Sequence, residues 1–405
     1  MNLGCIADDF TGATDLAALL RRSGASVKLH FGLPILPSDG LSDIEIIALK
    51  CRTEALSKAV TDCLKAGSWL LAGGAKKLYW KYCSTFDCTA EGNIGPVAEA
   101  LMELTKKTQS LYCPAFPENG RSVFMGHLFV GNRLLSESSM KDHPLTPMGD
   151  SDLTRVLAPQ VKGSVGLWSR IDQKNGEAFP TETHVIGDAV EFNDLKYLAS
   201  HAPSHVLLTG GSALALALPE LLSFASKGFM PCPQTAPRVL ILSGSCSLMT
   251  QKQVALYKAN NPAYQLNPES LSSGALEECI AWLRSQPYDQ APLIYATTTT
   301  DQVKKVQEKL GVAAAGALVE KAMAELSRIA FDLGFRRFVI AGGETSGAVT
   351  QALNIKEVMI GEEICPGVPW VFGGPNNDPV ALALKSGNFG SQSFFRDALN
   401  LLESH

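Results

Sequence analysis

Short apolar runs alternate with amphipathic helical patterns along almost the whole chain, and this alternation restricts the possible folds more than any other feature. The first run, Leu3–Ile6, precedes a predicted helix over about 14–23, which Gly24 ends. Similar pairs recur up to the last apolar run, Val380–Leu384, and a C-terminal helix. Strands that alternate with helices are typical of parallel βα units. The sequence therefore predicts an α/β protein with largely parallel sheets.

A proline-rich stretch at about 229–237 interrupts this pattern. The chain has 405 residues, which is long for a single domain. Three prolines within a dozen residues suit a semi-rigid linker. We predict two α/β domains, 1–228 and 238–405, with a cleft between them. In the second domain, the alternating runs Val358–Glu363 and Val368–Val371 predict an antiparallel extension of the sheet.

Charge and composition narrow the class of protein. The net charge of −5 gives no basic surface for nucleic acid or for an anionic membrane. The chain has no apolar run of about 18 residues and no signal-peptide pattern at its start. Its ten cysteines form neither a Cys-x-x-Cys pair nor a zinc-binding spacing. We expect a cytoplasmic small-molecule enzyme with reduced thiols and with neither nucleic acid nor membrane as a partner.

Two adjacent carboxylates follow the first predicted strand. Asp8 and Asp9 come directly after Leu3–Ile6, and Thr11 and Gly12 form a flexible turn behind them. The carboxyl ends of parallel strands lie at the edge of the sheet where α/β folds bind ligands. Capping of the next helix is the alternative, because Asp is a favoured N-cap. Capping needs only one carboxylate, so we predict a functional role for at least one of the pair.

Further charged and polar side chains follow other predicted strands of the first half. The set consists of Lys50, Arg52, Lys81, Ser84, Thr85, Asp87, Asn93, Asn119 and Arg121. Cations suit a ligand carboxylate, whereas carboxylates and amides suit hydroxyl groups, so the mixture fits a small polyhydroxylated acid. Each lysine or arginine alone could instead be a solvated surface charge. His143, in a proline-flanked loop, could contact a ligand or simply pack.

Three glycine-rich and hydroxyl-rich turns, 243–247, 342–347 and 387–390, follow apolar strands of the second half. Glycine lets the backbone approach a ligand, and free amides at a helix N-terminus hold anions. One such turn could be ordinary helix capping, but three in one domain predict a polyphosphate site. The turn at 342–347 is not a Walker A motif, because Ala348 and Val349 replace its Lys and Ser/Thr.

A sugar-acid site in one half and a nucleotide site in the other predict phosphoryl transfer. That reaction depends on positioning and charge neutralisation, with a carboxylate to deprotonate the acceptor hydroxyl. Two other classes of protein, a sensor and an oxidoreductase, fit the sequence less well. A non-catalytic sugar-acid sensor would usually carry a DNA-binding module, and no basic helix-turn-helix segment is evident. A dinucleotide-dependent oxidoreductase is disfavoured because no Gly-x-Gly-x-x-Gly follows the first strand of either half.

Three motifs carry a family resemblance that extends over essentially the whole chain. They are IADDFTGA at 6–13, KYCSTFDCTAEGNIGP at 81–96 and AGGETSGA at 341–348. With these motifs the chain resembles the four-carbon acid sugar kinases, and the middle motif is most similar to the 3-oxo-tetronate kinase subgroup. The middle motif departs from the expected pattern at Cys88, where a hydroxyl residue is expected. A hydrogen bond from that position is therefore not predicted.

The resemblance implies an N-terminal acid-sugar-binding domain and a C-terminal nucleotide-binding domain. The implied reaction is phosphorylation by Mg²⁺-ATP of the terminal, 4-position hydroxyl of a 3-oxo-tetronate. D-threonate or D-erythronate kinase activity is the alternative within the family. The epimer of the acid sugar, the ligands of Mg²⁺ and assembly into a homo-oligomer are left open.

The resemblance also implies roles for individual residues. Asp9 is the favoured base, with Asp8 and Asp87 as rivals or as partners on the magnesium side. Acid-sugar contacts are expected from Arg52, Lys81, Ser84, Thr85 and Arg121. Nucleotide contacts are expected from Ser245, Gly342, Gly343, Glu344, Thr345 and Gly387.

Overall fold

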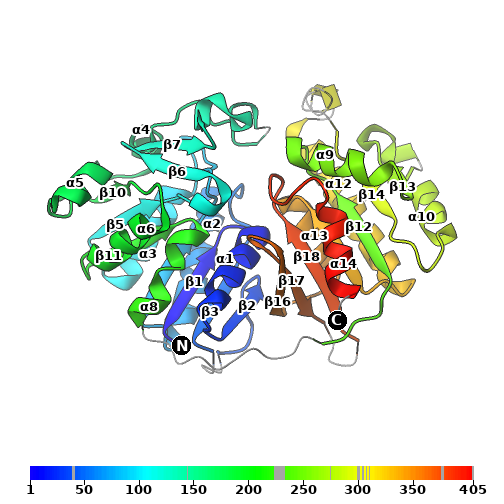
Figure 1. Ribbon diagram of the computed structural model, residues 1–405, viewed down its shortest axis with the longest axis horizontal. Coiled ribbons are helices and arrows are strands. Elements are labelled where there is room, and N and C mark those ends of the chain that lie inside the picture. The colour runs from blue at the N-terminus through cyan, green and yellow to red at the C-terminus, as the bar shows by residue number, and fades with distance from the viewer. Residues whose placement is uncertain are drawn as a thin grey trace. The chain divides into compact units, whose positions relative to one another are not determined.

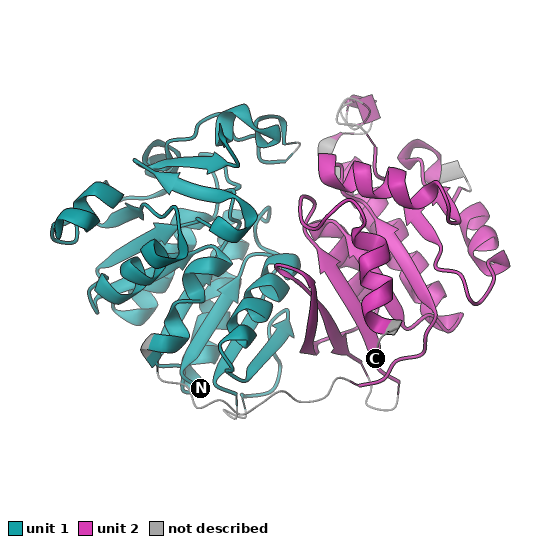
Figure 2. Cartoon of the chain, viewed as in Figure 1, with its two compact units in different colours: residues 1–230 teal, residues 231–405 magenta. Residues whose placement is uncertain are grey.

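The computed structural model describes the chain except for residues 39–41, 144, 223–232, 274, 299–301, 303–304, 307, 310, 375–377 and 404–405. The chain forms two compact units, Met1–Met230 (unit 1) and Pro231–His405 (unit 2), each with its own set of neighbouring strands and its own buried core (Figure 2). Part of the predicted linker at 229–237 lies outside the described residues. Within the described part of the chain, no helix combines the length and the apolar character that crossing a membrane requires.

Unit 1 is organised around a parallel sheet in the order β2-β3-β1-β4-β11-β5-β10-β9 (Figure 1). Its strands are β1 (Leu3–Ala7), β2 (Val27–Phe31), β3 (Ile44–Ala48), β4 (Lys77–Lys81), β5 (Gln109–Cys113), β9 (Val165–Trp168), β10 (His184–Gly187) and β11 (Val206–Gly210). Every residue of β1 and β3 is buried. Strands covered on both faces read as continuous apolar runs, which is why these segments could be predicted as parallel strands.

Helices connect the strands of unit 1. They are α1 (Phe10–Arg22), α2 (Leu56–Ala72), α3 (Ile94–Thr105), α4 (Leu153–Leu157), α5 (Arg170–Asn175), α6 (Phe192–His201), α7 (Ser212–Ala215) and α8 (Leu218–Leu222). Helices α1 and α6 both pack against α7, whereas α2 packs against α3. Because the α1 and α2 crossovers run in opposite directions along the sheet, the right-handed rule places them on opposite faces.

The first helix begins earlier than the sequence pattern suggested. It was expected at about Thr14, but it starts at Phe10 because Asp9 is its N-cap and accepts a hydrogen bond from the amide of Gly12 at 3.0 Å. The segment counted as a flexible turn is therefore the first helical turn.

A small antiparallel sheet follows β5 in unit 1. It consists of β6 (Arg121–Phe124), β7 (His127–Val130) and β8 (Arg133–Leu134), in that order. A tight turn with positive φ at Met125 and Gly126 joins its first two strands. Strands β7 and β8 also pair antiparallel, as a second hairpin.

Unit 2 has a mixed sheet in the order β13-β14-β12-β15-β18-β17-β16. Its strands are β12 (Val239–Ser243), β13 (Ala263–Gln265), β14 (Leu293–Tyr295), β15 (Arg337–Ala341), β16 (Glu357–Cys365), β17 (Val368–Gly373) and β18 (Val380–Lys385). Its helices include α9 (Leu248–Lys258), α10 (Ala275–Ser285), α12 (Val312–Asp332), α13 (Gly343–Ala352) and α14 (Phe394–Glu403). Strand β17 runs antiparallel to β16 and β18, which confirms the predicted antiparallel extension.

Strand order determines which loops can meet. In unit 1, β1 lies between β3 and β4, so the loops after these three strands share one edge of the sheet. In unit 2, β15 lies between β12 and β18, and all three are parallel. Apart from Arg121, which starts β6, the predicted acid-sugar residues lie at the ends of the first trio or in the loops after it, and the three glycine-rich turns follow the second.

Candidate active site

One guanidinium joins the two adjacent carboxylates of unit 1. Arg52, in the loop after β3, donates from Nε to Asp8 Oδ2 at 2.7 Å and from Nη2 to Asp8 Oδ1 at 2.9 Å. Its Nη2 also donates to Asp9 Oδ1 at 2.8 Å. Bidentate pairing of this kind fixes both the position and the plane of a carboxylate. Asp8 is thus the anchor that holds Arg52 beside Asp9.

Asp9 is the more accessible of the two carboxylates. Its side chain is 13% exposed, against 4% for Asp8. Oδ1 accepts the amide of Gly12 as well as Arg52, whereas Oδ2 accepts the hydroxyl of Thr11 at 2.5 Å. The capping alternative is therefore correct for Asp9. Capping does not use every lone pair, so Oδ2 can still accept a hydrogen bond from a substrate hydroxyl.

The surroundings move the pKa values of the two carboxyls apart. Burial alone would raise the pKa of Asp9, but the charges of Arg52 and Lys81 and the hydrogen bonds from Thr11 and Gly12 bring it below the usual value. Burial raises the pKa of Asp8, against the opposing effect of Arg52. Asp9 is therefore ionised at neutral pH, as a proton acceptor must be.

Lys81 approaches Asp9 across the backbone of Gly12. It is the last residue of β4, and only 2% of it is exposed. A Cβ atom added to Gly12 would lie 2.4 Å from Asp9 Oδ1 and 2.6 Å from Lys81 Nζ, so this position admits only glycine. Within the described part of the chain, the Lys81 ammonium forms no hydrogen bond or ion pair, which leaves it available to an anionic ligand.

The loop after β4 completes the cluster. Thr85 donates its hydroxyl hydrogen to Asp87 Oδ1 at 2.5 Å, and Asp87 Oδ2 lies 3.8 Å from Arg52 Nη1. Ser84, the neighbouring residue, is buried. The side-chain amide of Asn93 donates to the carbonyls of the Arg52 loop, at 2.7 Å to Cys51 and 3.0 Å to Glu54. Arg52 is thus the common partner of all three predicted carboxylates.

Arg121 and Asp15 extend the cluster away from Arg52. Arg121 starts β6 and is buried, which lowers its pKa, while the negative charges of Cys83, Asp87 and Asp15 act in the opposite direction. Asp15 accepts a hydrogen bond from the hydroxyl of Ser212 at 2.5 Å. No local sequence pattern could have paired Asp15 with a serine 197 residues away.

His143 lies close enough to Asp87 and Arg52 for their charges to act on it. Its Nδ1 accepts the amide of Thr146 at 3.1 Å, so the neutral ring carries its hydrogen on Nε2. Burial lowers the pKa of His143, and the charges of Asp87 and Arg52 also act on it. The loop histidine is a neutral Nε2–H donor at the border of the cluster.

The three glycine-rich turns of unit 2 touch one another. A Cβ atom added to Gly244 would lie 2.2 Å from Thr345 Oγ1, and one on Gly387 would lie 2.6 Å from Ser245 Oγ. Gly342 has a φ of 122°, and its own added Cβ would lie 3.2 Å from the amide nitrogen of Ser245. The predicted nucleotide residues from three separate segments therefore converge.

The N-terminus of α13 lies in this convergence. Its N-cap, Gly342, has no side chain to satisfy the first amides of the helix. The amides of Gly343, Glu344 and Thr345 are the kind of donors that hold phosphate at a helix N-terminus. Glu344 adds a carboxylate in the same turn, so a phosphate bound there would need a cation beside it.

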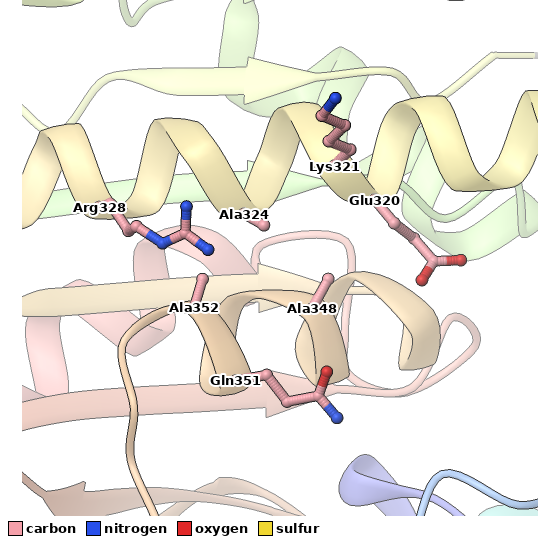
Figure 3. Close-up of a pocket in the computed structure, with 7 residues that line it drawn as sticks. All are labelled: Glu320, Lys321, Ala324, Arg328, Ala348, Gln351 and Ala352. Carbon is pink, nitrogen blue, oxygen red and sulfur yellow. The ribbon is translucent and has the colours of Figure 1, made fainter.

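A surface groove of about 230 Å³ runs between α12 and α13 (Figure 3). Its lining consists of Glu320, Lys321, Ala324, Arg328, Ala348, Gln351 and Ala352. None of the residues predicted to bind nucleotide lines this groove. The three glycine-rich turns and the groove are separate features of unit 2.

No group of three or more His, Cys, Asp or Glu side chains in the described part of the chain could hold a metal ion. Magnesium in phosphoryl-transfer enzymes is usually bound by one or two carboxylates together with substrate phosphates and water. The paired carboxylates of unit 1 and Glu344 of unit 2 fit that mode of binding. They do not fit a metal held by the protein alone.

Comparisons with known proteins cover both units. Residues 3–218 match a family described as "Sugar-binding N-terminal domain", and residues 240–395 match "Nucleotide-binding C-terminal domain". A 3-oxo-tetronate kinase of Pseudomonas fluorescens is 47% identical, over 99% of this chain and 97% of its own. A 3-oxo-tetronate kinase of Haemophilus influenzae is 39% identical, over 98% of both chains. A solved structure from Salmonella typhimurium superposes with a TM-score of 0.79 at 38% identity, over 98% of both chains.

Proposed function

Since this chain belongs to the four-carbon acid sugar kinase family, we propose that it phosphorylates the 4-position hydroxyl of a 3-oxo-tetronate with ATP. The observation that carries the proposal is the cluster in which Arg52 contacts both Asp8 and Asp9, beside the buried Lys81, whose ammonium has no hydrogen-bond or ion-pair partner among the described residues. This cluster offers a proton acceptor and cations within a few ångströms, which is what a hydroxy acid requires.

Each group has a proposed role. Asp9 accepts the proton of the 4-hydroxyl through Oδ2, while Arg52 and Thr11 hold its carboxylate in place. Lys81, Arg121, Ser84 and Thr85 bind the carboxylate and the oxygens of the acid sugar. Asp8 positions Arg52, and with only 4% of its side chain exposed it is less accessible to a substrate hydroxyl than Asp9.

The nucleotide is proposed to bind to the three loops of unit 2. Ser245, Gly387 and the amides of 342–345 hold the phosphates, and the close approach of the loops supports this assignment. When bound with the nucleotide, Mg²⁺ would neutralise the phosphate charge, and Glu344, in the first turn of α13, is the carboxylate of unit 2 proposed to hold it. Positioning of this kind supplies most of the rate in phosphoryl transfer.

An ADP-release assay over a panel of four-carbon acids tests the proposal. We expect turnover on at least one 3-oxo-tetronate and much slower turnover on D-threonate and D-erythronate. Phosphorus NMR of the product should show a phosphate ester on carbon 4. Folded protein that binds ATP but turns over none of these acids would contradict the substrate assignment.

A further inference from the structure

Lys385, the last residue of β18, has a fully buried side chain, which is rare for lysine. Its Nζ donates to Thr250 Oγ1 at 2.9 Å, to the carbonyl of Ser386 at 3.0 Å and to the carbonyl of Gly387 at 2.8 Å. An ammonium has three hydrogens, so these three acceptors match the protonated form. A neutral amine, with two hydrogens, would lose one of the bonds.

The buried ammonium has no counter-charge in the described part of unit 2. Its three hydrogen-bond acceptors are neutral, and it lies 5.8 Å from the ring centroid of Phe394. Cys365 of β16 is the titratable neighbour whose charge acts on it. Burial of an unpaired charge is unfavourable, and it lowers the pKa of Lys385 to about 7. The charged and neutral forms are therefore both populated near neutral pH.

Lys385 also connects the loops proposed to bind phosphate. The Gly387 carbonyl accepts hydrogen bonds from Ser247 Oγ at 2.5 Å and from Thr250 Oγ1 at 2.7 Å as well as from the Lys385 ammonium. The backbone carbonyl of Lys385 accepts the amide of Gly342 at 2.9 Å. One residue thus joins the turn at 387, the start of α9 and the turn at 342.

We propose that the Lys385 ammonium is the buried counter-charge of the nucleotide phosphates, so that binding of ADP or ATP draws a proton onto this side chain. The inference rests on the proposed nucleotide site. Anionic phosphates near Lys385 stabilise its charged form and so raise its pKa in the complex. The step consumes one proton from solvent and changes no covalent bond other than N–H. By linkage, nucleotide affinity falls as pH rises from the pKa of the free protein to that of the complex.

Isothermal titration calorimetry of the full-length protein with ADP tests this inference. At pH 8 the terminal phosphate, whose second pKa is about 6, is already ionised and takes up no proton. Titrations in two buffers of different ionisation enthalpy should show uptake of roughly half a proton or more per ADP bound. Between pH 7.5 and 9 the Kd should rise by up to about tenfold per pH unit.

Two variants test whether the proton taken up on ADP binding goes to Lys385. In Lys385→Met both the uptake and the pH dependence should be lost, whereas Lys252→Met, on an exposed position of α9, should behave as wild type. Uptake that persists in Lys385→Met would overturn the inference. If that variant does not fold, titration of the wild type is still a sufficient test. Wild-type protein that binds ADP at pH 8 without taking up a proton would overturn the inference. Absence of ADP binding at every pH would overturn the proposed function as well.

Discussion

At the residue scale, the contacts of Asp9 show how one carboxylate serves structure and chemistry together. It caps α1 through the amide of Gly12, and it is held beside Arg52 and Thr11. An N-cap residue is part of the helix end, so its side chain has little freedom to move. The carboxylate proposed as the base is thus fixed by the same hydrogen bonds that begin the helix.

Replacement of Asp9 by Asn tests its role as base. Asn is as good an N-cap as Asp, so the fold and ATP binding should be retained. Turnover should fall by about 10² or more, because an amide cannot accept the hydroxyl proton. Measurement of kcat together with the Kd for ATP separates the two effects, and Asp289→Asn at an exposed position is the control. Near-normal turnover in Asp9→Asn would remove Asp9 from the role.

Gly12→Ala tests the close contact between Asp9 and Lys81. Helix propensity alone favours Ala by about 1 kcal/mol, yet its Cβ would enter the space of both charged groups. We expect kcat/KM for the acid sugar to fall by about 10², since small displacements of reacting groups have effects of this size. The affinity of unit 2 for ATP should not change. A variant with full activity would show that Asp9 and Lys81 can separate without loss of function.

At the scale of elements, the strands could be predicted from the sequence better than the ends of the helices. Buried parallel strands such as β1 and β15 are continuous apolar runs, and the turns after them are rich in glycine. The start of α1 was misplaced by four residues because a glycine in a helical turn was read as a loop. Only the hydrogen bond from Gly12 to Asp9 shows that this glycine is helical.

Gly387→Ala tests the convergence of the three loops. The added methyl group would lie 2.6 Å from Ser245 Oγ, so one of the two loops must move. We expect the Kd for ATP to rise at least about tenfold, which corresponds to about 1.4 kcal/mol. Gly316→Ala, in α12, is the matched control, because its added methyl group meets no atom within 4 Å. Equal ATP affinities in the two variants would contradict the proposed nucleotide site.

At the scale of the whole molecule, each unit has its own set of neighbouring strands, and each collects its functional residues at the carboxyl ends of those strands. In unit 1 the strands are β3, β1 and β4, and in unit 2 they are β12, β15 and β18. The same topological rule therefore brings together most of the residues proposed to bind the acid sugar in unit 1 and those proposed to bind phosphate in unit 2.

The stability of unit 2 should depend on pH through Lys385. Its pKa is about 7 in the folded protein, against about 10.4 for an ordinary lysine. The unfolded chain therefore binds more protons above pH 7, and the free energy of unfolding rises with pH by at most about 1.4 kcal/mol per unit. Hydrogen exchange of the β15 and β18 amides should slow between pH 6.5 and 8, after correction for the intrinsic rate.

In Lys385→Met the rise in the free energy of unfolding between pH 6.5 and 8 should be absent. Saturating ADP should make this rise smaller in the wild type, because the bound phosphates favour the charged lysine. The window ends near pH 8, since cysteine thiols of the unfolded chain ionise at about 8.5 and oppose the trend. The free energy of unfolding of the wild type should rise with pH more steeply than that of Lys385→Met. If it does not, the folded state does not disfavour the charged form of Lys385.

The sequence by itself determined the α/β class, the strands, and the polar segments that follow them, because apolar periodicity and turn residues act over a few neighbouring positions. Tertiary structure decided which of those segments meet. Arg52 joins Asp8, Asp9 and Asp87, and Ser212 reaches Asp15 across most of unit 1. Such contacts depend on strand order, which no local pattern encodes. Burial likewise exists only in the folded chain, so the role proposed for Lys385 could not be predicted from its place beside a glycine-rich turn.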